Sequence, residues 1–338
     1  MRITELENSE LTYEKKHEFN VGVDLGFLHN RINLAADYYR RNNFDLIGVI
    51  NTQGAGGTIA KYANIASMRS SGIELTLSTQ NIKKKDFSWN TDFIFSKTKN
   101  EITDLKSHAN VLDLISGNGF GREGYPVRAL FSIPFAGLTE DGLPTFINQD
   151  GQRTISTLNF QEYEKLGFLK YEGTDPTITG SFGNILTYKN FKLNVFLTYS
   201  FGNVIRLDPV FSSAYSDLDA MPKEFKNRWM KAGDENTTNI PTIVSYRMNQ
   251  QYAYLNMAYN AYNYSDVRIA DGGFIRLKEI SLSYDLPAKV LSFFRLNKLQ
   301  FKIQATNLFL LYADSKLNGQ DPEFFRSGGV STPVPRQF

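Results

Sequence analysis

The sequence of 338 residues contains no cysteine. Disulfides, thiolate metal sites and a cysteine nucleophile are therefore excluded, and the absence suits a protein that crosses an oxidising periplasm without mispairing. Histidine is also scarce: His17, His29 and His108 are the three, and none lies at metal-ligand spacing from another. We expect them in turns or loops, and we predict neither a metal site nor a cofactor.

Long apolar runs and an excess of charge are missing as well. No stretch approaches the roughly 18 apolar residues of a transmembrane helix, and the mean hydropathy is -0.33, so a helical membrane protein is excluded. The 37 basic residues are balanced by 35 acidic ones, which argues against nucleic acid as a partner. The start of the chain, MRITELENSELTYEKKHEF, has no apolar core of a signal peptide. We expect either a cytoplasmic protein or an internal piece of something longer.

Aromatic residues, in contrast, are abundant. With 26 Phe and 18 Tyr they reach 14% of the chain, more than most soluble folds need. Many stand in segments where apolar and polar residues alternate, which is the period of a β-strand with one apolar face. Most of these segments reach or approach the 9 to 11 residues that cross a bilayer at a tilt, whereas soluble strands average about 5 to 6. The segments are 19–27, 32–39, 72–79, 87–96, 191–206 and 298–307.

For the first two segments, the alternation alone does not show what their apolar face contacts. Their apolar face could lie against a protein core or against acyl chains. We expect lipid on that face, which includes Phe19, Val21, Val23, Leu25 and Phe27, with Tyr38 and Tyr39 near the end of the band. The polar face, with Asn20, Asp24, Asn33 and Asp37, is expected to line a wet lumen.

The connections between the segments alternate in length. Short turns are predicted at 28–31, 81–86 and 188–190, with a modest one at 287–297. Long connections are predicted at 42–69, 99–178, 207–272 and from 307 to the end. Short periplasmic turns and long outer loops are typical of an outer-membrane β-barrel. A soluble sandwich or propeller would show turn signals every 8 to 12 residues on both sides, so it would not explain this asymmetry.

Parity constrains the connection 99–178. The strand before it must run outward and the strand after it inward, so it contains either no crossings or two. Its segment 125–147 resembles a hairpin with TEDG as the turn. We expect an extracellular hairpin, because Pro126, Pro134 and Pro144 fit poorly in a continuous ladder.

We expect no catalytic site in this sequence. The carboxylates Asp24, Asp37, Glu74 and Asp92 lie on polar strand faces, where they are ordinary in a water-filled lumen. Binding is more credible in the connection 207–272, where aromatic side chains alternate with amides and carboxylates. They could contact a sugar or a peptide, or they could simply pack against neighbours, and the sequence favours neither. The predicted contacts are Trp229, Tyr252, Tyr254, Tyr259, Tyr262 and Tyr264, beside Tyr215 and Tyr246.

Five separated motifs resemble the carboxy-terminal barrel of the SusC/RagA family of TonB-linked outer-membrane proteins. They span nearly the whole chain in the family's order, and NRWMKAGDENTTNIPTIV resembles the family's Arg-Trp and Gly-Asp loop before the penultimate hairpin. The motifs are FNVGVDLGFLHNRINLAADYYRRNNFDLI, NIASMRSSGIELTLST, EGYPVRALFSIPFAGL, DGGFIRLKEISLSYDLP and ATNLFLLYADSKLNGQDPE.

The resemblance implies an all-β fold: residues 1–338 would form a partial antiparallel transmembrane barrel, roughly the last 8 to 10 strands of a 22-stranded transporter. The ending STPVPRQF resembles the segment that leads into the family's last strand, so that strand is expected to be missing, with Phe338 at its start. The plug domain, TonB box and signal peptide are expected to be absent from this chain.

The implied function is import of glycans or peptides across the outer membrane. The implied partners are a SusD-like surface lipoprotein, outer-membrane lipid, and TonB, ExbB and ExbD, which act through the plug. Two alternatives stay open: a soluble carbohydrate-binding β-protein, and a non-transporting outer-membrane adhesin. No motif in the sequence identifies the solute.

Overall fold

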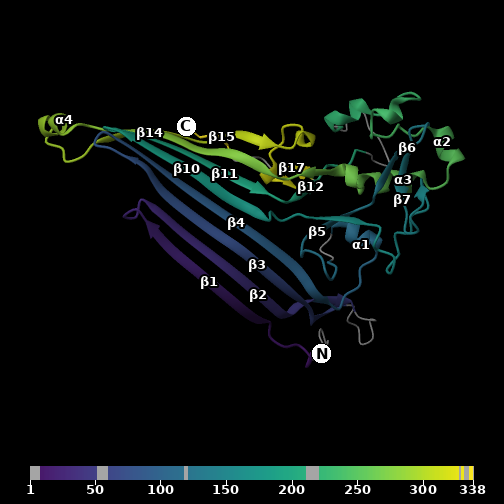
Figure 1. Cartoon of the computed structure of the whole chain (residues 1–338). Helices are drawn as coiled ribbons and strands as arrows, with labels where there is room; N and C mark the ends of the chain where they lie inside the picture. Colours follow the sequence, from purple (N-terminus) through teal and green to yellow (C-terminus); the bar gives the residue numbers. More distant parts are fainter. Residues whose placement is uncertain are drawn as a thin grey trace, which may run out of the picture.

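The computed structural model describes residues 8–51, 60–117, 121–210, 221–326, 329–330 and 335–337. Its dominant element is a curved antiparallel sheet of eight strands in the order β1-β2-β3-β4-β10-β11-β14-β15 (Figure 1). The predicted antiparallel barrel segment of 8 to 10 strands is thereby confirmed. The strands are β1 Lys15–Phe27, β2 Ile32–Asn51, β3 Ala60–Lys83, β4 Phe87–Leu105, β10 Ile178–Tyr188, β11 Phe191–Phe201, β14 Phe274–Asp285 and β15 Gln300–Ala313.

The pairing register aligns side chains of one kind across the whole sheet. Cross-strand partners share a face, so each row of partners has one character. One row is wholly apolar: Leu25, Leu34, Leu77, Phe93, Phe182, Leu197, Leu277 and Phe309. The neighbouring row on the other face is small or polar except for one aromatic: Gly26, Asn33, Ser78, Asp92, Gly183, Phe196, Glu279 and Thr306.

Three of the four short connections are tight turns, as predicted. The turn after β1 holds Leu28, His29 and Asn30 at positive φ, and the turn after β10 holds Lys189 there. The β3–β4 turn is shorter than expected, since β3 continues to Lys83. The fourth connection contains the short helix α4, Ala288–Phe293, at the end of the sheet remote from the other helices (Figure 1).

The expected long loops are wrong at two places. The connection 42–69 is mostly strand, because β2 reaches Asn51 and β3 starts at Ala60. β15 likewise continues to Ala313, beyond the expected strand end. A ladder that rises above the bilayer needs no apolar face, so alternation in the sequence underestimates its length.

The strand predicted at 191–206 is divided in the structure. β11 ends at Phe201, and Gly202 adopts a φ of 82° that favours glycine. The next residues form β12, Val204–Arg206, which pairs with β13, Ile269–Asp271, rather than with a barrel strand.

The connection 99–178 makes no barrel crossing. β4 pairs directly with β10, and the residues between them form the extracellular hairpin that the prolines predicted. Thr139 and Gly142 close its turn by a backbone hydrogen bond of 2.9 Å. The elements here are α1 Val111–Ser116, β5 Ala129–Ser132, β6 Phe135–Leu138, β7 Pro144–Ile147, β8 Arg153–Thr154 and β9 Lys170–Gly173.

This hairpin region packs with the connection 207–272 into a cap (Figure 1), defined here as residues 106–117, 121–177 and 204–273 within the described part. A single apolar core unites its elements, with Phe131, Ile133, Phe146, Leu255 and Tyr262 among the buried members. None of the helices in the described part is long and apolar enough to cross a membrane. The remaining cap elements are η1 Lys223–Asn227, η2 Asp234–Asn236, α2 Tyr246–Gln251, α3 Leu255–Asn263 and η3 Asp266–Arg268.

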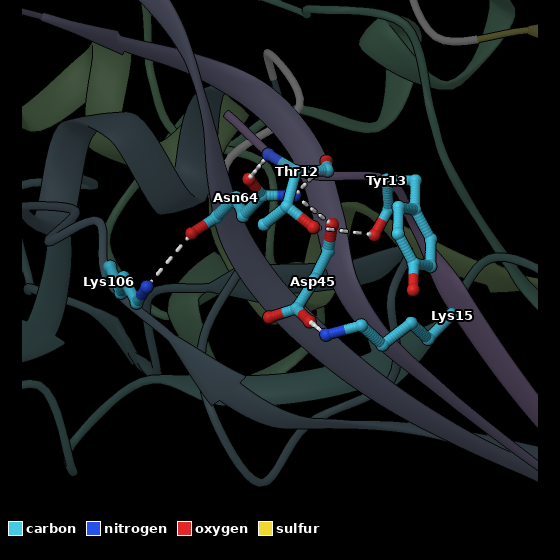
Figure 2. A network of polar contacts seen from close by, with 6 residues as sticks. All are labelled: Thr12, Tyr13, Lys15, Asp45, Asn64 and Lys106. Atoms are coloured by element: carbon cyan, nitrogen blue, oxygen red, sulfur yellow. Dashed lines mark hydrogen bonds and ion pairs between the residues drawn. The ribbon is translucent and has the colours of Figure 1, made fainter. Parts of the chain in front are cut away.

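The lead-in to β1 crosses a bulge in β2 and is held by one amide side chain (Figure 2). Register shifts between Asn43 and Ile47 interrupt the β2–β3 ladder, and Asp45 lies there with a φ of 57°. Asn64 of β3 acts like a missing ladder residue: its Oδ1 accepts from the Thr12 N–H at 2.8 Å, and its Nδ2 donates to the Thr12 carbonyl at 2.8 Å. Lys15 closes the network through an ion pair with Asp45 at 2.8 Å.

The sheet ends in two edges, β1 and β15, which do not pair with each other in the described part. Gln337 bonds to Thr306 on the outer edge of β15 in both directions. Phe338, Tyr215 and the connection 52–59 lie outside the described residues. The last elements are η4 Ser315–Leu317, η5 Pro322–Phe324, β16 Phe325–Arg326 and β17 Gly329–Val330.

Candidate solute-contact site

A strap, residues 314–326, folds back over the polar face of the sheet beneath the cap. Leu317 and Phe325 bury themselves against Ile205, Leu207 and Ala270 of the cap. Its acidic end is fixed by Arg276 of β14, which lies on the polar face because its partner Thr198 does. The strap therefore covers the extracellular end of the polar wall.

The Arg276 guanidinium is buried and meets two carboxylates of the strap. Its Nη2 lies 2.6 and 2.7 Å from the two oxygens of Asp321 and 3.1 Å from Glu323 Oε2. Burial strengthens these contacts, because water screens them poorly. The same burial would penalise an unpaired Arg276, so its buried partner Asp321 stabilises the position of the strap.

A second buried arginine links two parts of the cap, β12 and the segment of α1 and β5. Arg206 donates to the carbonyls of Ile115 and Phe131, and its guanidinium lies 5.0 Å from the ring centre of Tyr264. Desolvation by burial lowers the pKa of Arg206 to about 10. Two carbonyls and a ring face offset part of the cost of burying this charge. Arg206 therefore stabilises the packing of the cap and is not available to bind a ligand.

The six predicted aromatic contacts divide between core and surface. Tyr262 is 1% exposed and Tyr259 is 8% exposed, so both belong to the cap core. The Tyr259 hydroxyl donates to the Thr242 carbonyl at 2.7 Å, and burial raises the pKa of Tyr262 to about 12. Tyr264 is half-buried against Arg206. For these three the structure supports the packing interpretation.

Trp229, Tyr252 and Tyr254 reach the surface. The Trp229 ring lies against Gly142 of the hairpin turn, and its Nε1 donates to Glu235 at 3.0 Å. The Tyr252 hydroxyl lies 3.4 Å from Asp141 of the same turn, while Tyr254 is 69% exposed. Solute contact by this group stays a prediction, narrowed to these three side chains.

A hollow of about 990 Å³ lies between β9, the end of β11 and β13. Its charged lining consists of Lys170, Glu172, Asp266, Asp271 and Lys316. Asp266 is held in place by the Phe135 N–H at 2.9 Å and pairs with Lys170. Lys316 donates to the Ile269 carbonyl at 2.9 Å.

Glu172 is the carboxylate of this hollow without an ion pair or hydrogen bond among the described residues. Burial raises its pKa, and the charge of Asp266 adds to the effect. Because Glu172 is exposed at the hollow and its carboxylate has no partner there, it is a candidate for ligand contact. Among the described residues, no group of three or more metal-ligating side chains is arranged to hold a metal ion.

No pattern in the sequence indicates this hollow. Lys170 and Asp266 are 96 residues apart, and each stands alone in a connection with no motif around it. Tyr252 and Asp141 are likewise 111 residues apart. Only the folding of two connections into one cap brings these groups together.

Known proteins of similar sequence are TonB-dependent receptors. No family model matches the chain. The chain is 26% identical over 346 residues to the TonB-dependent receptor P3 of Formosa agariphila, covering 95% of this chain and 32% of the relative. It is also 26% identical over 352 residues to the TonB-dependent receptor SusC of Bacteroides thetaiotaomicron, covering 97% and 31%.

The resemblance to the SusC/RagA family is confirmed. A solved structure of the RagAB peptide transporter matches the chain with a TM-score of 0.75 and 22% identity, over 97% of this chain and 34% of the other. That match shows the fold. The chain spans about a third of the length of the relatives it matches.

The location in the outer membrane is confirmed with the family. The curated relatives are receptors by name and not enzymes, in agreement with the prediction that no catalysis takes place here. What the whole protein transports, and with which partners, is a matter for proposal.

Proposed function

We propose that the SusC/RagA-like chain forms one section of the wall and extracellular cap of a TonB-dependent outer-membrane importer. The carrying observation is the combination of a sheet with one apolar face and a charged hollow beside the cap, between β9, the end of β11 and β13. A wall with a built hollow at its outer entrance suits capture of a solute before passage. In this proposal the plug, displaced by TonB with ExbB and ExbD, gates the lumen.

The solute class we propose is a glycan or a peptide, and the hollow favours the peptide. Three carboxylates and two ammonium groups line it, and such a lining binds the charged groups of a peptide better than the hydroxyls of a neutral sugar. Tyr171, 49% exposed at the same hollow, offers an aromatic face to either class.

The proposed partner is a SusD-like surface lipoprotein seated on the cap. The outer surface of the cap carries unusually exposed large side chains, with Tyr246 at 81% and Tyr254 at 69% exposure. Aromatic side chains of this kind are enriched at protein interfaces. Co-purification of a SusD-like neighbour with the receptor supports the partnership, whereas a receptor that purifies alone under mild detergent favours the adhesin alternative.

Substitution of Glu172 tests the solute site. In the intact receptor, Glu172→Gln should weaken binding of a lysine-containing peptide by roughly tenfold, since one charge-assisted contact contributes about 1.5–3 kcal/mol. Calorimetric titration of the purified protein measures the effect, and growth on the solute measures uptake. Glu323→Gln, which removes a carboxylate of the strap outside the hollow, is the matched control. Equal affinity in the two variants would remove the hollow from the pathway while leaving the importer assignment intact.

A further inference from the structure

The connection between β14 and β15 ends the sheet on the side of the short turns. It contains α4, Ala288–Phe293, introduced by Pro287 and followed by Phe294 and Arg295. Figure 1 places α4 at the opposite end of the sheet from the cap. Because short turns are periplasmic in such barrels, α4 lies at the inner, phospholipid leaflet of the membrane.

The helix exposes an apolar face with no protein partner in the described part. Val290, Phe293 and Phe294 follow the i, i+3, i+4 spacing, so they share one side of α4, with Ser292 on the other. Phe293 is 83% exposed and Phe294 is 60% exposed. The two rings meet edge to face at 5.1 Å, which leaves their outer surfaces uncovered. Two phenyl rings held in water are unfavourable unless something apolar covers them.

The two strands that lead into α4 also end in exposed apolar side chains. The last outward pairs before the connection are Tyr284 with Phe301 and Leu282 with Ile303. Ile303 is 77% exposed and Phe301 is 60% exposed. Exposed apolar side chains therefore stand at the end of both strands that lead into α4, and the same bilayer that covers them is the natural cover of the helix.

The charges around α4 indicate which kind of lipid headgroup it contacts. Residues 286–299 contain Lys289, Arg295 and Lys298 and no acidic residue. None of the three cations forms an ion pair with a described residue. Long basic side chains beside an apolar face extend their charges to the headgroup level while their stems stay in the apolar layer.

The other short turns also carry a net positive charge. Across 28–31, 83–86, 188–191 and 285–300 the chain carries eight basic residues against two acidic ones, Asp86 and Asp285. The whole rim on this side is therefore attractive to anionic lipid, and α4 is the part of the rim that adds an apolar face.

From this geometry we propose that α4 is an interfacial anchor. Val290, Phe293 and Phe294 insert into the periplasmic leaflet, and Lys289, Arg295 and Lys298 bind the phosphate of an anionic phospholipid. The anchor fixes the periplasmic end of the β14–β15 hairpin at a set depth. It is independent of the solute and of the lipoprotein partner.

Depth measurement tests the insertion. The intact receptor, freed of any cysteine, receives a nitroxide label through Phe293→Cys or, as the matched control on the opposite face, Ser292→Cys. In vesicles of phosphatidylcholine mixed with phosphatidylglycerol, the label at 293 should be relaxed by oxygen and shielded from a water-soluble nickel chelate, with the reverse at 292. Equal access of the chelate to both labels would overturn the proposal. Dipolar broadening between labels at 293 would assign the face to a second copy of the chain instead.

Charge removal tests the headgroup. Lys289→Gln, Arg295→Gln and Lys298→Gln combined should strongly reduce the difference in label depth between vesicles with and without phosphatidylglycerol, since each basic residue near an anionic surface strengthens binding about fivefold. The same number of changes on the cap, Lys223→Gln, Lys226→Gln and Lys231→Gln, should leave the difference unchanged. A triple variant of α4 that still responds to phosphatidylglycerol like the parent would contradict the lipid contact.

Discussion

At the scale of single residues, the two faces of one strand differ in the solvent they meet. Val23 pairs with Ala36 on the apolar face of β1, and Asn20 lies on the other face. Val23→Arg in the intact receptor should destabilise the barrel by roughly 2–4 kcal/mol if it lies at mid-membrane, because the guanidinium must enter lipid. Asn20→Arg should be nearly neutral. Urea unfolding in lipid vesicles measures both, and equal tolerance at the two positions would mean that the solvents are assigned to the wrong faces.

Asn64 offers a second test at this scale, in a contact that no pattern in the sequence indicates. Asn64→Asp keeps the acceptor for the Thr12 N–H but removes the donor to the carbonyls of Thr12 and Asp45. The free energy of unfolding should fall by about 1–3 kcal/mol, since those carbonyls lose their partner beside a new negative charge. Hydrogen exchange should quicken in residues 8–14 and not in the barrel strands. Asn249→Asp, on the exposed side of α2, is the control, and matching exchange in the two variants would contradict the role of Asn64.

At the scale of elements, alternation in the sequence predicted the barrel strands but not where they end. Phe19 to Phe27 and Leu299 to Ala305 show their period because one face meets lipid and the other meets water. Arg40, Arg41 and Asn42 continue the β2 ladder with no such contrast, so the sequence there resembles a loop. The cap escaped prediction for another reason: its defining contacts, such as Arg206 with Phe131, join residues 75 positions apart.

The strap makes the corresponding prediction for an element. Asp321→Asn removes the closest counter-charge of Arg276, whose side chain is 6% exposed. Loss of one partner of a buried pair destabilises by roughly 3–5 kcal/mol, and the strap can relieve that strain by leaving the wall. Limited proteolysis should therefore cut within 314–326 in this variant while the cap stays resistant. Glu323→Gln, at a half-exposed partner, should produce much less cleavage, and comparable cleavage in both would show that Arg276 does not hold the strap.

At the scale of the whole molecule, eight strands form a wall and not a closed barrel. In the described part, the edge of β1 is unpaired and that of β15 is paired only at Thr306, by Gln337; each edge has about five N–H and C=O pairs, and lipid offers no partner for the free ones. At several kcal/mol per group the penalty is on the order of tens of kcal/mol, against a net stability of roughly 5–15 kcal/mol for a domain. The chain expressed alone should therefore not give a heat-modifiable, protease-resistant species in outer-membrane fractions, whereas the intact receptor should. Such a species from residues 1–338 by themselves would require β1 and β15 to find each other, and cross-linking cysteines placed at Val21→Cys and Ile303→Cys would detect that closure.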